Sequence, residues 1–287
     1  MMSAAWRGDL EAALGATVVR ADPVGGGDIN DAFRAQLADG RRVFVKTHRA
    51  PPAGMYVAEA RGLAWLAGQG PAPLARSSGG EVDRPLRTPQ VLAVDERFLA
   101  LEWLDLDGNA HALAEPLGRG LAALHRLGAP SFGLDHDNFL ATIAQDNTPA
   151  PDIATFFVER RLRPLVERNL WPKLDALRAR PDVFGPPEPP ARLHGDLWWG
   201  NVAACDGAPV VIDPAVYGGH REIDLAMLAL FGGISARFVR AYDEVWPLAE
   251  GWRERVPLWQ LYPLAAHAVL FGGGYGRRVA EILDALT

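Results

Sequence analysis

The sequence contains a single cysteine, Cys205, among its 287 residues. An intrachain disulfide is therefore excluded, and so is a zinc site built from cysteine ligands. Basic residues are also in short supply, because 29 Lys and Arg stand against 35 Asp and Glu and give a formal net charge of −6. We expect no nucleic-acid partner, since proteins that bind nucleic acids use a basic excess to neutralise phosphates.

Long apolar runs are absent as well. Residues 225–230 form one of the longest, far short of the roughly 18 residues that a transmembrane helix requires. The charged residues Arg7, Asp9 and Glu11 stand where a secretory signal would be continuously apolar. We therefore expect no membrane insertion and a cytoplasmic location. The sequence does not determine the assembly state, for which a monomer is favoured.

The composition that is present, 49% hydrophobic and 22% charged, is typical of a soluble globular chain. Its length allows two lobes or one large domain. Up to about residue 105 short β-like runs dominate, and Asp39-Gly40 is a hairpin signal between two of them. The predicted strands are residues 17–20, 32–37, 42–47, 91–94 and 98–103, and one helix is predicted at residues 54–67.

After Asp105 the pattern becomes helical, because leucines recur at intervals of three and four residues from Leu113 to Leu127. Gly128 is the expected stop of that helix. Further helices are predicted at residues 153–169, 224–230, 236–246 and 259–271, and the proline-rich residues 181–190 predict an extended connector. The predicted fold class is α+β: a small antiparallel β-sheet lobe with one helix, residues 1–104, and a larger mainly helical lobe, residues 105–287. We expect a cleft where the two lobes join.

The most informative stretch is the catalytic-loop candidate, residues 194–201, with the sequence His-Gly-Asp-Leu-Trp-Trp-Gly-Asn. Asp196 and Asn201 are five residues apart, and Asp213 follows at the end of a short apolar run. This is the pattern of kinase-type phosphoryl transfer, in which one carboxylate accepts the proton of a substrate hydroxyl. The amide and the second carboxylate are hard oxygen ligands that suit Mg²⁺. The alternative is that these are turn and helix-capping residues in an ordinary loop.

A second constellation lies in the predicted β-rich lobe. Lys46 closes a strand-like run, and Glu59 follows thirteen residues later on the apolar stripe of the predicted helix. A lone carboxylate there would be costly, so Glu59 needs a cation, and Lys46 is the obvious one. Such an ion pair between a strand lysine and a helix glutamate directs the lysine at nucleotide phosphates. The alternative is a surface lysine and a solvated glutamate.

Glycines stand between the first two predicted strands, at Gly25, Gly26 and Gly27, and Asp28 follows them. Glycine lets backbone amides approach a phosphate closely, although a glycine run between strands is often only a turn. No Walker A motif occurs anywhere in the chain. We assign these four residues to ATP by their place in the hairpin.

The connector between the predicted lobes, residues 98–105, is apolar until Glu102. A segment in this position normally offers backbone groups to adenine while apolar side chains enclose the base. By position alone, Glu102 and Leu104 are the candidates for this contact. An edge strand that runs into a linker would have the same sequence.

These residues together resemble the fructosamine kinase (ketosamine-3-kinase) family, relatives of the aminoglycoside phosphotransferases with a protein-kinase-like fold. The resemblance extends from Gly25 to about Tyr275, and its more specific parts are Leu197-Trp198 and residues 213–227, 231–233 and 271–275. It implies a nucleotide-binding first lobe and a second lobe for catalysis and substrate. The implied reaction is phosphorylation, with ATP and Mg²⁺, of the 3-hydroxyl of a ketoamine, the sugar adduct on an amine or a glycated protein lysine. The phosphorylated adduct is unstable and releases the amine.

The resemblance also implies roles for single residues. Asp196 is then the base, and Asn201 and Asp213 are the Mg²⁺ ligands. Trp198 is similar to the aromatic wall against which the sugar lies. His267 matches a family histidine that faces the sugar, with a satisfied histidine on a core helix as the equal alternative.

Neighbouring residues are expected to support the site rather than to contact the substrate. His220, Arg221 and Asp224 are expected to brace the catalytic loop, because a carboxylate at a helix start suits the binding of loop amides. Arg161 is a candidate for shaping the substrate pocket. Trp199 stands where relatives often have a small residue, so its role is open.

Two other functions compete with this interpretation. One is a kinase of another hydroxylated amine, such as an aminoglycoside or choline, which would share the catalytic loop. The other is a nucleotide-binding pseudokinase scaffold, which we expect to lack at least one of the site residues that are present here. A protein kinase is disfavoured, because no Asp-Phe-Gly and no Ala-Pro-Glu motif occurs.

Overall fold

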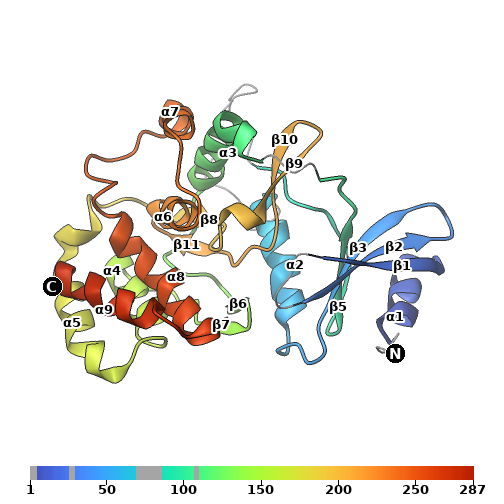
Figure 1. The fold of residues 1–287 in the computed structure, drawn as a ribbon, viewed down its shortest axis with the longest axis horizontal. Coiled ribbons are helices and arrows are strands. Elements are labelled where there is room, and N and C mark those ends of the chain that lie inside the picture. The colour runs from blue at the N-terminus through green and yellow to red at the C-terminus, as the bar shows by residue number, and fades with distance from the viewer. Residues whose placement is uncertain (1–4, 26–29, 69–85, 107–109) are drawn as a thin grey trace.

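The computed structural model describes residues 5–25, 30–68, 86–106 and 110–287. A small lobe built on one antiparallel sheet adjoins a larger, mainly helical lobe (Figure 1). This agrees with the predicted α+β class. No helix in the described ranges is both long and apolar enough to cross a bilayer.

The sheet of the small lobe has the strand order β1-β2-β3-β5-β4, with all neighbours antiparallel. Its strands are β1 (Val18–Val24), β2 (Asp31–Leu37), β3 (Arg42–Thr47), β4 (Val91–Asp95) and β5 (Phe98–Glu102). The hairpin predicted at Asp39-Gly40 joins β2 to β3, and Gly40 has the positive φ of 90° that such a turn favours.

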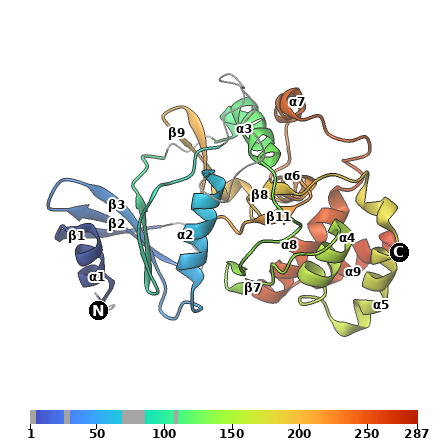
Figure 2. The same cartoon turned by 180° about the vertical axis from the view of Figure 1, so that it is seen from behind.

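Two helices cover the two faces of this sheet. Residues of β5 alternate between them, since Phe98 and Ala100 pack with α1 (Ala5–Leu14), whereas Leu99 and Leu101 pack with α2 (Met55–Leu66). The prediction of only one helix in this lobe is therefore wrong. Seen from the front and from behind, α2 stands between the sheet and the larger lobe (Figures 1 and 2).

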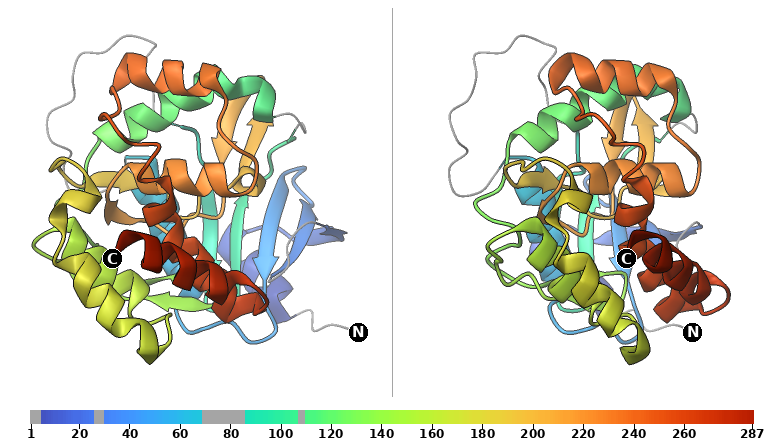
Figure 3. Two further views of the ribbon diagram at one scale, coloured as in Figure 1. Left: turned by 60° about the vertical axis from the view of Figure 1, so that its left-hand side comes forward. Right: turned by 90° about the vertical axis from the view of Figure 1, so that its left-hand side faces the viewer.

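The first core of the large lobe is formed by α3 (Ala114–Arg126), α6 (Glu222–Leu230) and α7 (Ala236–Val245). Helices α3 and α7 lie side by side (Figure 3). The predicted end of α3 is confirmed, because Gly128 has a φ of 66° just beyond it. Leu197 of the catalytic loop is fully buried in this core, which anchors the loop.

The second core packs around α8 (Val256–Phe271) and α9 (Tyr275–Leu286). The prediction of one helix over residues 153–169 is wrong, because a single turn, α4 (Ile153–Thr155), leads into a π-helix, η3 (Phe156–Leu162). Pro164 explains the end of that segment, since its missing N–H and its ring prevent the helix from continuing. The remaining helices of the large lobe in the described ranges are α5 (Trp171–Arg178) and the short 3₁₀ turns η2 (Ala110–Leu113), η4 (Arg168–Leu170), η5 (Pro181–Phe184) and η6 (Trp199–Asn201).

Short strand pairs position the catalytic-loop candidate. The loop leaves β8 (Ala191–Leu193) and enters β9 (Val202–Cys205). Asp213 lies between β10 (Ala208–Val211) and β11 (Tyr217–Gly219), which pair with β9 and β8 respectively. A third pair, β6 (Asn138–Leu140) with β7 (Ile143–Gln145), lies beside α2. The pairing of β8 with β11 and of β9 with β10 thus brings Asp213 close to the catalytic loop.

Candidate active site

Lys46 is the centre of the site. Its Nζ lies 2.8 Å from Glu59 Oε1 and 2.8 Å from Asp213 Oδ1. The first contact joins β3 to α2, and the second joins the small lobe to the large one. The side chains of Lys46 and Glu59 are 7% and 12% exposed, whereas that of Asp213 is 43% exposed. The predicted lysine–glutamate pair therefore forms, and it is tied to the predicted metal ligand.

The charges of this triad depend on one another. Burial alone would lower the pKa of Lys46, but the carboxylates of Asp213 and Glu59 outweigh it and raise that pKa. Burial raises the pKa of Glu59, while Lys46 opposes the rise. Lys46 is therefore a permanent cation that holds Glu59 in place.

Asp196 and Asn201 face each other across the catalytic loop. Asn201 Nδ2 donates to the backbone carbonyl of Asp196 at 2.8 Å and to its Oδ2 at 3.0 Å. One carboxylate oxygen of Asp196, Oδ2, is thus oriented by the amide of Asn201. The five-residue spacing predicted from the sequence has this geometric basis.

The pKa of Asp196 is raised to about 8, first by burial and then by the negative charge of Asp213. A carboxylate in such surroundings holds a proton more firmly than a solvated one. Once ionised, it therefore has a higher affinity for a proton than a solvated aspartate.

The donor set fits a magnesium ion. Asn201 uses its Nδ2 to bind Asp196, so its Oδ1 remains as a neutral oxygen ligand. Asp213 places one oxygen on Lys46 and has a second one available. No group of three or more His, Cys, Asp or Glu in the described part of the chain would hold a metal by itself. Mg²⁺ commonly takes one or two protein oxygens and completes its shell with phosphates and water, so two ligands are sufficient.

Asp224, in the first turn of α6, fixes the backbone of the catalytic loop. Its carboxylate accepts hydrogen bonds from the amides of His194, at 2.8 Å, and Gly195, at 2.9 Å. His125 adds a third contact through its Nε2, at 3.1 Å from Asp224. The other ring nitrogen of His125, Nδ1, is hydrogen-bonded to the hydroxyl of Tyr242. Burial opposes ionisation, yet the bonds from His125 and the loop lower the pKa of Asp224. The bracing role predicted for Asp224 is confirmed, whereas His125 and Tyr242 were not foreseen.

His220 and Arg221 do not share this role, so the prediction that they brace the loop is wrong. Arg221 binds both carboxylate oxygens of Glu188 and the carbonyl of Trp246. His220 stacks on Trp259 with ring centroids 4.8 Å apart, and burial lowers its pKa to about 3, so it is neutral. Both residues stabilise the region around the start of α6.

His194 has a structural role. Its Nε2 bonds to the carbonyl of Ile212 at 2.9 Å, and because a carbonyl only accepts, this nitrogen carries the proton. Burial lowers the pKa of His194, which keeps the ring neutral. It therefore links the catalytic loop to the strand end that precedes Asp213.

The predicted substrate residues Trp198 and His267 belong to one aromatic group. Trp198 is 41% exposed and contacts Phe231 edge-on, with centroids 6.3 Å apart. Phe231 in turn lies 5.0 Å from His267. Trp199 points elsewhere, since its ring stacks on His111 at 3.9 Å and its Nε1 donates to the carbonyl of Gly233. Trp199 thus fastens the loop, and Trp198 presents an open face.

The nucleotide-binding candidates are less fully described. Gly25 is exposed at the end of β1, while Gly26, Gly27 and Asp28 lie outside the described residues. At the connector, the Glu102 amide donates to the carbonyl of Gln90 at 2.9 Å, and its carboxylate accepts from the Gln90 amide at 3.0 Å. The Glu102 amide is therefore already used. Leu104, just beyond β5, makes no hydrogen bond of this kind within the described ranges.

Arg161 does not line a pocket, contrary to the expectation from sequence. It is 1% exposed, and its guanidinium lies between the rings of Phe156 and Tyr217, 4.5 and 4.1 Å from their centroids. It donates to the carbonyl of Asp146 and to Asn147 Oδ1. Arg161 is an internal support of the second core.

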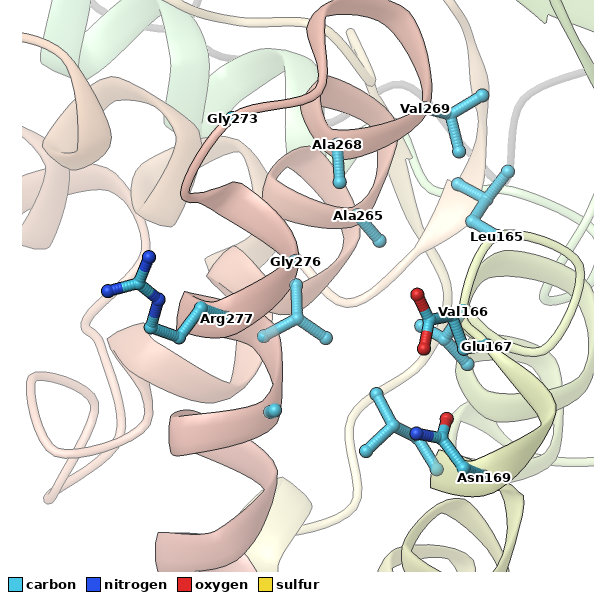
Figure 4. Close-up of a pocket in the computed structure, with 13 residues that line it drawn as sticks. Leu165, Val166, Glu167, Asn169, Ala265, Ala268, Val269, Gly273, Gly276 and Arg277 are labelled. Atoms are coloured by element: carbon cyan, nitrogen blue, oxygen red, sulfur yellow. The ribbon is translucent and has the colours of Figure 1, made fainter.

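A groove of about 540 Å³ opens between η4, α8 and α9 (Figure 4). Val166, Ala268 and Gly276 are among its lining residues, and Glu167 and Arg277 add charges at its sides. None of the predicted site residues lines it. The candidate site at the Lys46–Asp213 junction is therefore separate from this groove.

Comparison with known proteins shows which proteins this chain resembles. The sequence model of the fructosamine kinase family, described as "Fructosamine kinase", matches residues 2–287. A relative from Enterococcus faecium, named a probable ketoamine kinase, is 37% identical over 279 residues and covers 91% of this chain and 93% of its own. The crystal structure of a Thermobifida fusca protein assigned as a fructosamine-3-kinase superposes with a TM-score of 0.83 at 39% identity, over 98% of each chain.

Proteins of much lower sequence identity share the fold of this chain. The streptomycin–ATP complex of the aminoglycoside phosphotransferase APH(2″)-IIa superposes with a TM-score of 0.62 over 99% of this chain and 97% of its own, at 14% identity. That degree of identity shows a shared fold only, and the fold is protein-kinase-like. The family match, by contrast, spans nearly the whole sequence. This chain belongs to the fructosamine kinase family.

Proposed function

We propose that the protein transfers the γ-phosphoryl group of ATP to the 3-hydroxyl of a ketoamine. The observation that carries the proposal is the position of Lys46, whose Nζ lies 2.8 Å from both Glu59 and Asp213 and so joins the two lobes at one point. Phosphoryl transfer depends on positioning and charge, and this junction supplies both. Membership of the fructosamine kinase family supports the substrate class.

In this proposal Asp196 accepts the proton of the attacking hydroxyl on its Oδ1. Asn201 keeps the other carboxylate oxygen oriented through its 3.0 Å hydrogen bond. Asn201 and Asp213 would hold Mg²⁺ through the oxygens identified above. When bound, the ion would offset negative charge on the phosphates.

Lys46 would contact the phosphates while Glu59 keeps it in place. The hairpin residues Gly25, Gly26, Gly27 and Asp28 are proposed to cover the phosphates through their amides. At the connector we assign Leu104 as the amide donor to adenine. Glu102 is restricted to its carbonyl, because its own amide binds Gln90.

On the sugar side, Trp198 offers the exposed ring against which the ketose would lie. Phe231 lies between Trp198 and His267 and contacts both rings. Phosphorylation at the 3-position then gives an unstable adduct whose breakdown frees the amine, so the proposed role is deglycation of amines or protein lysines.

The test is ADP release from ATP and Mg²⁺ with a substrate panel of fructosyl-lysine, ribulosyl-lysine, an aminoglycoside and choline. We expect turnover of a ketoamine and none of the other two classes. Asp196→Asn should abolish most of it, whereas Asp206→Asn, a change of the same kind at an aspartate that is 91% exposed, should not. Turnover of choline or the aminoglycoside alone would contradict the proposal, and ATP binding without any turnover would favour a pseudokinase.

A further inference from the structure

The exposed aromatic side chains of the described residues gather in one place. Trp198, Phe231 and Phe271 are 41%, 41% and 59% exposed, and no other aromatic stands among the exposed large apolar residues of the described ranges. Contiguous exposed apolar surface of this kind marks a binding site more often than chance. The group starts at Trp198, two residues after Asp196, so it is continuous with the catalytic loop.

His267 is the centre of the group. Its ring centroid lies 5.0 Å from that of Phe231, 5.4 Å from Phe271 and 5.2 Å from Tyr275. Phe231 follows α6, His267 and Phe271 lie in the last two turns of α8, and Tyr275 begins α9. We call Trp198, Phe231, His267, Phe271 and Tyr275 the aromatic surface.

The orientation of Trp198 within this surface is fixed. Its indole lies so close to Gly200 that a Cβ added there would be 2.2 Å from the ring. Phe231 also contacts the indole, at an interplanar angle of 76°. The ring is therefore held open to solvent by its neighbours, as a preorganised binding face requires.

His267 adds a hydrogen-bond acceptor to the rings. Its Nδ1 bonds to the carbonyl of Pro263 at 2.7 Å, and since a carbonyl only accepts, Nδ1 carries the proton. In the neutral ring Nε2 is then an acceptor. A ligand here would meet π-faces and one nitrogen lone pair, which together suit a cation that carries N–H groups.

No cation of the protein occupies these π-faces within the described part of the chain. Elsewhere arginines cover aromatic rings, as Arg221 covers Trp246 at 4.1 Å and Arg192 covers Trp65 at 4.7 Å. Among the described residues, none of the arginine–aromatic contacts involves the aromatic surface. Its rings are thus left for a cation from outside.

We propose that Phe231, His267, Phe271 and Tyr275 of the aromatic surface bind the protonated amine of the substrate and the first carbons of the alkyl chain attached to it. This inference rests on the proposed function and names the part of the ketoamine that each region recognises. An aliphatic secondary amine keeps its proton at neutral pH and has two N–H donors. Phe231, Phe271 and Tyr275 contact the ammonium group and the chain, and His267 Nε2 accepts one N–H. The ketose is left to Trp198 and the catalytic loop.

The experiment compares two acceptors that differ in one atom: 1-deoxy-1-butylamino-fructose, which is a cation, and 1-O-butyl-fructose, its neutral ether. Wild-type protein should show a kcat/KM roughly 2- to 30-fold higher for the amine, the range that a cation–π interaction supplies. Phe271→Leu, which keeps an apolar side chain, should remove most of that preference and change the ether by less than about twofold. Phe271→Tyr should retain it.

The matched control is Val269→Leu, a change at a residue of α8 that is 54% exposed and lines the groove of Figure 4 instead of the aromatic surface. It should leave both acceptors unchanged. Equal kcat/KM values of the wild type for the two acceptors would overturn the amine subsite while leaving the kinase intact. An equal loss of kcat/KM for both acceptors in Phe271→Leu would do the same. Turnover of neither acceptor by the wild type would overturn the proposed function, and the subsite with it.

Discussion

Replacing Gly62 by alanine tests whether α2 is held in place by direct contact with the large lobe. Gly62 lies in α2, one turn after Glu59, and faces the segment that follows Asp213. A Cβ there would lie 3.2 and 3.5 Å from the two methyl groups of Val216 and 3.7 Å from Pro214. Of the two partners of Lys46, Glu59 therefore lies on the α2 side of this contact and Asp213 lies on the side of the large lobe.

Two effects of the substitution oppose each other. Alanine in a helix interior stabilises by about 0.5–1 kcal/mol relative to glycine. Overpacking a core costs about 1–3 kcal/mol. Val216 cannot easily give way, because it is 1% exposed, its carbonyl accepts a 2.7 Å bond from Asn138 and its branched side chain has few rotamers. We therefore expect a net loss of about 0–2.5 kcal/mol and a displacement of α2 away from Val216.

The assays are thermal unfolding and kcat/KM for ATP. At about 2–4 °C per kcal/mol, Gly62→Ala should lower Tm by up to roughly 10 °C, and a small shift of Glu59 should lower kcat/KM by roughly 3- to 10-fold. The matched control is Gly8→Ala in α1, where no atom lies within 4 Å of the added Cβ. It should gain stability and keep full activity. If Gly62→Ala behaves like Gly8→Ala in both assays, the contact does not position α2.

Five further outcomes follow from the site. Asp196→Asn should lower kcat by about 10²- to 10⁴-fold. Because the pKa of Asp196 is raised from 3.8 to about 8, the folded state binds more protons than the unfolded state between those values, so this group lowers stability as pH rises through that window. In denaturant titrations without Mg²⁺, the free energy of unfolding of Asp196→Asn should rise relative to that of the wild type between pH 4 and pH 8. A difference that falls over this range would contradict the raised pKa of Asp196. For the same reason kcat/KM should rise with pH until Asp196 is ionised, and a profile that stays flat in the wild type would remove Asp196 as the base. Glu59→Gln should raise the KM for ATP roughly tenfold by loosening Lys46, whereas Glu281→Gln, at an exposed ion pair, should not change it. Asp224→Asn should cost about 3–5 kcal/mol in the free energy of unfolding, because it leaves buried loop donors without a charged acceptor, and a loss below 1 kcal/mol in urea titration would refute that role.

Much of the small lobe was predictable because its pattern is local. Strands β2 and β3 follow from alternating residues around Asp39-Gly40, and α2 follows from its apolar stripe. Helix α1 was missed although Trp6 and Leu10 are one turn apart, since charged residues separate the few apolar ones in this short segment. The Lys46–Glu59 pair was predictable because a carboxylate on an apolar helix face needs a cation close by.

What could not be predicted depends on contacts between distant segments. His125 falls on the buried side of α3, but nothing in the sequence indicates that Tyr242 and Asp224 meet it there. Arg161 shows the same limit, because its burial between Phe156 and Tyr217 follows from a π-helix that periodicity does not reveal. The contact of Lys46 with Asp213, 167 residues away, likewise appears only in the folded chain.

The most direct test of the central claim is the position of the phosphate in the product. After incubation of the protein with ATP, Mg²⁺ and fructosyl-lysine or ribulosyl-lysine, ³¹P NMR with proton coupling should show a monoester on the 3-oxygen, and Asp196→Asn should form it at less than about a hundredth of the rate. A phosphate on another oxygen, or formation of the 3-phosphate by Asp196→Asn at the wild-type rate, would contradict the account.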